Sequence, residues 1–298
     1  MYCCYTIHYI STHTYKVYKL FDNTSIYFSG FELSKASFKR KHTIKYKTFM
    51  LSCILCLVGP GLFILGTYYP TELTLFDTTE IKPVAHLDLQ WNVRPNNVCL
   101  IPGEKVAVMC RRGNKIVIVS VKNNQLQREH DIHIDCQPMC ITSYKDDLFV
   151  VTLNKRTCHV SISSVTLTGD RHVVSLVCDM SERVMWNYSE QYSMTTSKES
   201  DPKIYVAYVQ RSNVLEVSLD GSTLRSISMP HTKGYIKIMN VVSVGEYILC
   251  LFSAGKRLLL ADIKSEKTSV VMKQKEEHWG YRASVCLSNH QNPSHRGS

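Results

Sequence analysis

Four stretches of the sequence share one pattern, and this pattern limits the fold more than any other feature. In the first, Lys105–Cys110 and Lys115–Ser120 are strand-length runs rich in Val, Ile and Met, separated by the polar residues Arg111–Asn114. Two β-rich runs around a short Gly/Asn turn predict a β-hairpin. The other pairs of runs are Asp147–Thr152 with Cys158–Ile162, Lys203–Tyr208 with Val214–Leu219, and Glu246–Leu251 with Leu258–Asp262.

The spacing of these hairpins predicts the architecture. The first apolar residues of their leading strands are Val106, Leu148, Ile204 and Tyr247, which gives steps of 42, 56 and 43 residues. A four-stranded blade of a β-propeller takes roughly 40–50 residues. The sequence therefore predicts an all-β fold, an incomplete β-propeller of about four to five four-stranded blades over residues 81–287. Residues 281–287 are expected to start a fifth blade that the sequence does not complete.

Each unit is predicted to have an inner strand before its hairpin and an outer strand after it. In the third unit the inner strand is expected near Val184–Tyr188. The polar stretch Ser189–Pro202 is expected to be an inserted loop, which would account for the long step. Val84–Gln90 alternates apolar with polar residues and is expected to close the ring by pairing with the last blade.

One segment predicts a membrane helix. Phe49–Tyr69 has 21 residues and no charge, and about 20 apolar residues suffice to cross a bilayer. Six Lys/Arg lie from Lys35 to Lys47 just before it, which predicts a single-pass protein with a cytosolic N-terminus and an exported propeller. Gly59–Gly61, with Pro60 between them, would break such a helix. A buried hairpin or a spurious exon is the alternative. If residues 1–80 are a gene-model artefact, the protein is expected in the cytoplasm.

The remaining segments complete the expected domain organisation. Residues 1–48 form a basic tail without clear periodicity, 70–80 a linker and 288–298 a disordered tail, so the propeller is expected to be truncated. The tail 1–48 holds eight Lys/Arg and two acidic residues, a net charge of +6, whereas the other 250 residues hold 27 and 23, a net charge of +4. A general affinity for nucleic acid is therefore weakly supported.

The candidate binding residues are basic and lie on the hairpin turns. Turns at equivalent places in radial blades point to the same face, so these cations are predicted to form one basic rim that attracts an acidic protein or RNA phosphates. The alternative is that they only solvate the turns. The predicted partner-binding residues are Arg111, Arg112, Lys155, Arg156, Arg211, Lys256 and Arg257.

No motif in the sequence predicts catalysis, a cofactor or a metal. Neither a catalytic triad order, a phosphate-binding loop nor a dinucleotide fingerprint is found, so no catalytic residue and no cofactor is assigned. His130, His133, Cys136 and Cys140 form a string whose spacing only loosely resembles that of zinc ligands. Packing in the core or on the surface is the favoured reading of these residues. Several of the 12 cysteines lie inside strand patterns, which is typical of buried free thiols.

The order of an apolar inner strand, a turn, the hairpin of Lys105–Val121 and an amphipathic outer strand resembles the NHL-type β-propeller of invertebrate tripartite-motif proteins. The resemblance covers about residues 81–287. The sequence lacks a strict Asn-His-Leu signature and the clustered Cys/His pairs of the family's RING and B-box modules. The family's ubiquitin ligase activity is therefore not expected of this chain. It implies a non-enzymatic module that binds protein, or RNA in some relatives, through its rim and loops. The alternative is a hydrolase or lyase with a site in the central channel.

Overall fold

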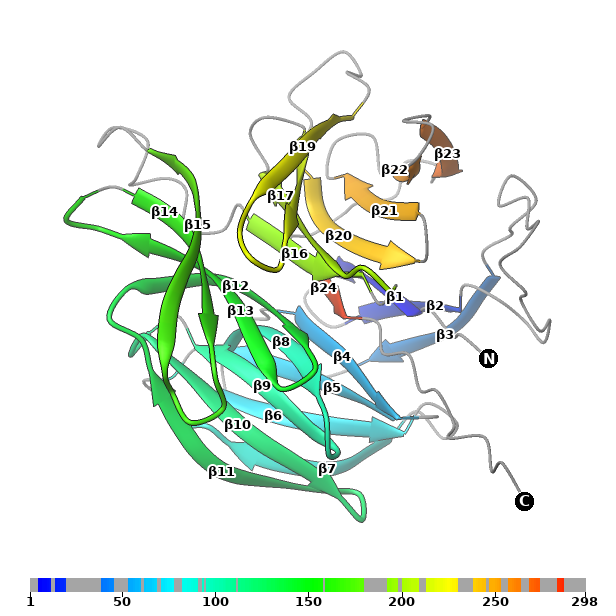
Figure 1. The fold of residues 1–298 in the computed structure, drawn as a ribbon. Helices are drawn as coiled ribbons and strands as arrows, with labels where there is room; N and C mark the ends of the chain where they lie inside the picture. Colours follow the sequence, from blue (N-terminus) through cyan, green and yellow to red (C-terminus); the bar gives the residue numbers. More distant parts are fainter. Residues whose placement is uncertain are drawn as a thin grey trace, which may run out of the picture.

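The fold consists of antiparallel sheets arranged around a centre (Figure 1). The computed structural model describes residues 5–11, 14–19, 39–45, 53–59, 62–68, 71–77, 82–90, 93, 95–110, 112–157, 159–179, 192–197, 200–208, 213–229, 238–244, 247–252, 257–263, 268–273 and 283–286. Within these residues every regular element is a β-strand.

Four sheets have four strands each, and each sheet follows the chain from its inner to its outer strand. The first contains β8 (Pro95–Ile101), β9 (Lys105–Cys110), β10 (Lys115–Lys122) and β11 (Gln125–His133). The second contains β12 (Gln137–Tyr144), β13 (Asp147–Asn154), β14 (His159–Val165) and β15 (Arg171–Asp179). The third contains β16 (Tyr192–Thr196), β17 (Lys203–Tyr208), β18 (Asn213–Ser218) and β19 (Thr223–Ser228). The fourth contains β20 (Ile238–Val244), β21 (Tyr247–Phe252), β22 (Arg257–Asp262) and β23 (Thr268–Lys273).

These four sheets confirm the predicted repeats. In each, the hairpin found in the sequence forms the second and third strands, for example β9 with β10 and β13 with β14. The hairpin strands β9 and β10 are buried over nearly their whole length, whereas the outer strand β11 alternates exposed with partly buried residues. Continuous apolar runs therefore mark the middle of each sheet, and alternation marks its edge.

A fifth sheet joins β4 (Cys53–Gly59), β5 (Leu62–Tyr68), β6 (Thr71–Asp77) and β7 (Lys82–Asp88), and β24 (Ala283–Cys286) pairs in parallel with β4. Strand β24 also lies beside β20 and beside β1 (Tyr5–Ser11). Strand β1 forms a three-stranded sheet with β2 (Thr14–Lys19) and β3 (Lys39–Lys45). Strands from both ends of the chain thus meet here, because β24 contacts both inner strands, β4 and β20, and also β1. The arrangement is that of an incomplete β-propeller.

The inner strands run in the same direction, and hydroxyl groups connect them. The backbone N–H groups of Val241 and Ser243 on β20 donate to the Oγ of Ser193 (3.0 Å) and the Oγ1 of Thr195 (3.4 Å) on β16. From the first contact to the second, the chain advances two residues on each strand, so β16 and β20 run in the same direction. Likewise Thr196 donates to the carbonyl of Ser143 at 2.7 Å. The first–second and third–fourth turns of every sheet therefore lie at one end of the ring, and the second–third turns lie at the other.

Apolar side chains fill the space between neighbouring sheets. One cluster joins β4–β7 to β8–β11 and includes Leu73, Leu75, Val108 and Val117. A second lies between β8–β11 and β12–β15, and two more follow around the ring. The sheets β8–β11, β12–β15 and β16–β19 each have a cluster on both faces, so the apolar area that stabilises them lies between blades.

The predicted membrane helix Phe49–Tyr69 is wrong, because β4 and β5 occupy this segment as an antiparallel hairpin. The alternative of a buried hairpin is the one found: Val58, Phe63, Ile64 and Leu65 are buried against protein. Gly59, the first residue of the stretch that would break a helix, is the last residue of β4. No helix among the described residues has the length and apolarity needed to cross a membrane.

Three segments before the first predicted hairpin also differ from the expectation. Strand β6 (Thr71–Asp77) occupies the expected linker, and four of its consecutive residues are buried. Strand β7 pairs with β6 instead of closing the ring against the last blade. The tail 1–48 contains β1–β3, which agrees with the strand preference of its Tyr, Thr, Ile and Val residues. The segment 288–298 lies outside the described residues.

The inner strand of the third unit also differs from the prediction. It is β16, Tyr192–Thr196, inside the stretch expected to be a loop, whereas Val184–Tyr188 lies outside the described residues. The polar composition of β16 wrongly predicts a loop, because its hydroxyl groups form hydrogen bonds with the neighbouring inner strands. Ser193 and Thr196, both buried, supply contacts that an apolar strand would lack.

Candidate functional site

The basic turns are the first candidate surface. Arg112 lies in the β9–β10 turn, and Lys155 and Arg156 lie in the β13–β14 turn. All three side chains are exposed. Because both turns join second and third strands, they lie at the same end of neighbouring sheets, as predicted. We call the surface formed by Arg112, Lys155 and Arg156 the basic face.

The other predicted binding residues are not placed on this face by the structure. Arg111, Arg211 and Lys256 lie outside the described residues. Arg257 is the first residue of β22, where it pairs with Lys273, and its side chain is not described. The basic face is thus described for two adjacent blades.

Local hydrogen bonds fix the two turns. The side-chain oxygen of Asn154 accepts the backbone N–H groups of Arg156 (3.0 Å) and Thr157 (3.3 Å), a common way for Asn to form a turn. In the other turn, the carbonyl of Asn114 accepts the N–H of Ile134 at 2.8 Å. The segment between β11 and β12, which connects the first sheet to the second, is therefore hydrogen-bonded to the turn that carries Arg112.

Lys115 follows the first turn, but its charge is already compensated. Its Nζ lies 2.6 Å from Oδ2 of Asp131, and Arg128 holds both oxygens of the same carboxylate at 2.9 and 2.6 Å. Burial raises the pKa of Asp131, but the hydrogen bonds and charges of Arg128 and Lys115 outweigh burial and lower the pKa below its usual value. These three groups form an internal ionic cluster and do not add to the basic face.

We expect Asp131→Asn to lower the free energy of unfolding by about 1–2 kcal/mol at pH 7. Since the folded pKa of Asp131 is depressed, its ionic stabilisation is fully present above the ordinary carboxyl pKa and is lost as the pH falls through the folded pKa. Urea unfolding at pH 7 and in steps down to about pH 3 measures this. The variant should lose less stability with acidification than wild type, and Asp146→Asn, at an exposed turn, should follow wild type.

A fourth cation lies between the same two blades and was missed from the sequence. Arg171, the first residue of β15, is half-buried, and its Nε and Nη2 donate to the Oγ of Ser163 at 3.0 and 2.9 Å. Its Nη2 also donates to Oγ1 of Thr152 (3.2 Å), and its Nη1 donates to Sγ of Cys136 (3.8 Å). These partners come from three different segments, so no local pattern indicates the contact.

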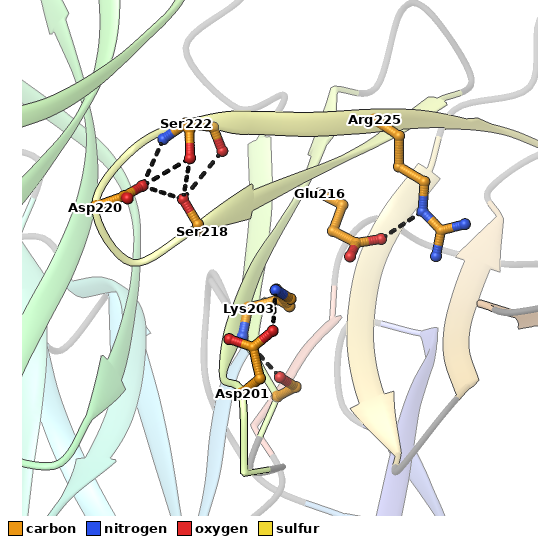
Figure 2. A network of polar contacts seen from close by, with 8 residues as sticks. Asp201, Lys203, Glu216, Ser218, Asp220, Ser222 and Arg225 are labelled. Carbon is orange, nitrogen blue, oxygen red and sulfur yellow. Dashed lines mark hydrogen bonds and ion pairs between the residues drawn. The ribbon is translucent and has the colours of Figure 1, made fainter.

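The opposite end of the ring carries acidic turns. Exposed acids occupy the first–second or third–fourth turns of three consecutive sheets, and Lys145 is the cation described in these turns. In Figure 2, the hydroxyl of Ser218 and the backbone and hydroxyl of Ser222 donate to Asp220. These contacts lower the pKa of its carboxyl to about 2, and Lys203 pairs with Asp201. We call this surface the acidic face; its acids are Glu104, Asp146, Asp170, Asp201 and Asp220.

The Cys/His string does not form a metal site. His130 Nε2 lies 2.9 Å from the carbonyl of Leu167, Cys136 meets Arg171, and Cys140 is fully buried, where desolvation raises the pKa of its thiol. Among the described residues, no group of three or more His, Cys, Asp or Glu could hold a metal ion.

One group resembles parts of a catalytic triad. Thr74 Oγ1 lies 3.2 Å from both Nδ1 of His86 and Oε1 of Glu72, and the His86 and Glu72 atoms are 3.7 Å apart. Thr74 and Glu72 both lie near the same ring nitrogen of His86, Nδ1, so the imidazole cannot relay a proton from the hydroxyl to the carboxylate. Thr74 is also completely buried. The group is a hydrogen-bonded contact between β6 and β7.

No family model matches the sequence, and no curated protein matches it. Solved structures do resemble the fold. A chain of a nidogen/laminin complex aligns with a TM-score of 0.59 and 12% identity over 88% of this chain and 92% of that chain. A catalytically inactive virginiamycin B lyase from Staphylococcus aureus with quinupristin aligns with a TM-score of 0.56 and 9% identity over 90% and 84%. A streptogramin B lyase aligns at 0.52 and 12% over 74% and 70%.

These similarities support the β-propeller fold. They do not extend to the NHL or tripartite-motif resemblance, which stays a prediction. Propellers of this kind include both binding modules and lyases, so fold likeness at this identity carries no function.

Proposed function

We propose that this propeller is a non-catalytic interaction module that binds a protein partner on the basic face. The observation that carries the proposal is the placement of Arg112, Lys155 and Arg156. They are exposed, they lie in equivalent turns of adjacent blades, and they point to one end of the ring. A partner with acidic groups would meet all three at once.

The charge arrangement suits recognition by a single face. Exposed cations attract an acidic partner from a distance of about one Debye length, roughly 8–10 Å at physiological salt, and raise the association rate. The acidic face at the other end repels the same partner. The propeller would therefore bind in one orientation, and screening by salt should weaken the complex.

The test is a pull-down of partners by the full chain across a salt series. We expect the triple variant Arg112→Ser, Lys155→Ser, Arg156→Ser to recover at least about ten-fold less of an acidic partner at low salt, since each exposed charge pair contributes up to about 1 kcal/mol. Exposed turn residues have little effect on stability, so the fold should persist. The matched control is the double variant Lys122→Ser, Lys145→Ser, which removes exposed cations near the other end.

Equal recovery by wild type and the triple variant, unchanged by salt, would show that the basic turns only solvate the surface. The alternative function is a hydrolase or lyase with a site in the central channel. However, the inner-strand hydroxyls of Ser143, Ser193 and Thr196 are hydrogen-bonded to neighbouring strands. They contribute to blade packing, so the interaction module is the better-supported function.

A further inference from the structure

Arg171 has an unusual environment for a half-buried cation. Its guanidinium contacts the hydroxyls of Ser163 and Thr152 and the thiol of Cys136. Both hydroxyl residues are buried, with exposed fractions of 0%. A positive charge removed from water and held by neutral dipoles is less well stabilised than one paired with an anion.

The position of this guanidinium links it to the basic face. Thr152 lies two residues before Asn154, where the β13–β14 turn with Lys155 and Arg156 begins. Cys136 lies on the short link between β11 and β12, two residues after Ile134, which is hydrogen-bonded to the turn carrying Arg112. Arg171 begins β15 beside Asp170 at the acidic end, and its guanidinium reaches back between the two blades toward Thr152 and Cys136, whose segments lead to the basic face.

One part of the guanidinium can be released for a ligand. Nη1 contacts Sγ of Cys136 at 3.8 Å, and a neutral sulfur is a weak acceptor. A carboxylate would replace this contact with a charge-assisted hydrogen bond. The Nε and Nη2 contacts to Ser163 and Thr152 would hold the side chain in place while Nη1 binds.

We propose that the junction of β8–β11 and β12–β15 is a carboxylate-binding subsite in which Arg171 anchors an acidic polypeptide held by Arg112, Lys155 and Arg156. This inference rests on the proposed function and identifies its partner class. A polypeptide fits better than RNA because the acidic face, with Glu104, Asp146 and Asp170 on these two blades, opposes a long polyanion that wraps the ring.

The first test uses Cys136 as a reporter. The full chain is alkylated with iodoacetate, which carries a carboxylate, or with neutral iodoacetamide, and modification of Cys136 is measured by peptide mass spectrometry. We expect Arg171→Gln to lower the iodoacetate-to-iodoacetamide rate ratio by at least about three-fold. A change in thiolate fraction affects both rates equally, so the ratio reports attraction of the carboxylate.

Matched variants separate the subsite from general charge and folding effects. Lys122→Gln removes one exposed cation and should leave the rate ratio unchanged. Arg171→Lys keeps the positive charge and should retain most of the wild-type rate ratio. Cys110 and Cys250 are buried, which raises the pKa of each thiol to about 12, so their modification would reveal an unfolded sample. An unchanged ratio in folded Arg171→Gln would overturn the proposal.

The second test measures binding of a fluorescent deca-glutamate peptide and of a single-stranded RNA of equal charge. We expect the peptide to bind more tightly, and both Arg171→Gln and the triple turn variant to weaken it. If the turn variant loses peptide binding and Arg171→Gln does not, the subsite is wrong and the proposed function stands. Tighter binding of the RNA would overturn the acidic polypeptide as the partner class.

Discussion

Gly221→Ala is expected to lower the free energy of unfolding by about 2–4 kcal/mol. Gly221 lies in the β18–β19 turn with φ of +96°, and a Cβ built there would lie 1.8 Å from the carbonyl oxygen of Val174 and 2.5 Å from its carbonyl carbon. The atoms in the way are backbone of β15, so the turn must move away from the neighbouring blade. Backbone strain of about 1 kcal/mol adds to about 1–3 kcal/mol from overpacking.

Urea unfolding measures this difference, and Gly103→Ala is the matched control. Gly103 also has a positive φ, +78°, but a Cβ there would meet nothing within 4 Å. The control should lose only the strain, about 1 kcal/mol. Equal losses in the two variants would mean that the approach of the β18–β19 turn to β15 is not needed for stability.

The predictable part of the fold is the part governed by local pattern. The hairpins around Val106, Leu148, Ile204 and Tyr247 were found because apolar, β-branched runs flank short polar turns, and the same residues determine the structure. The number of residues between successive hairpins also predicts the four-stranded blades correctly, because each of these blades consists of four consecutive strands. The basic turns followed from the same repeat.

The missed parts depend on long-range contacts or on ambiguous composition. An uncharged run such as Phe49–Tyr69 has the composition of a membrane helix and also of two strands buried on both faces. Only the neighbouring β6 and β24 distinguish the two. Strand β16 was missed because its Ser and Thr residues are typical of loops. In the structure their hydroxyl groups form hydrogen bonds with strands more than 40 residues away in sequence.

The candidate site shows the same division. Arg112, Lys155 and Arg156 could be predicted because they lie on the repeated turns. Arg171 could not, because its partners Thr152 and Cys136 are 19 and 35 residues away in sequence. The contact of its guanidinium with Cys136 depends on the packing of one blade against the next.

The second large effect is expected at the ion pair of Glu216 and Arg225. Figure 2 shows these side chains meeting between β18 and β19, with Arg225 Nε 2.6 Å from Oε2 of Glu216. The Glu216 side chain is 8% exposed and that of Arg225 is 32% exposed. We expect Arg225→Met to lower the free energy of unfolding by about 3 kcal/mol, because it leaves a buried carboxylate without its cation.

The double variant Glu216→Leu, Arg225→Met decides whether the loss comes from the unpaired charge. If it does, replacing both partners with apolar residues should restore most of the stability, since desolvation of a buried pair offsets much of its attraction. Urea unfolding of the four proteins gives the coupling between the two positions. A double variant as unstable as Arg225→Met alone would instead assign the loss to packing of the Arg225 side chain at the edge of the blade, because removing the carboxylate would then have brought no relief.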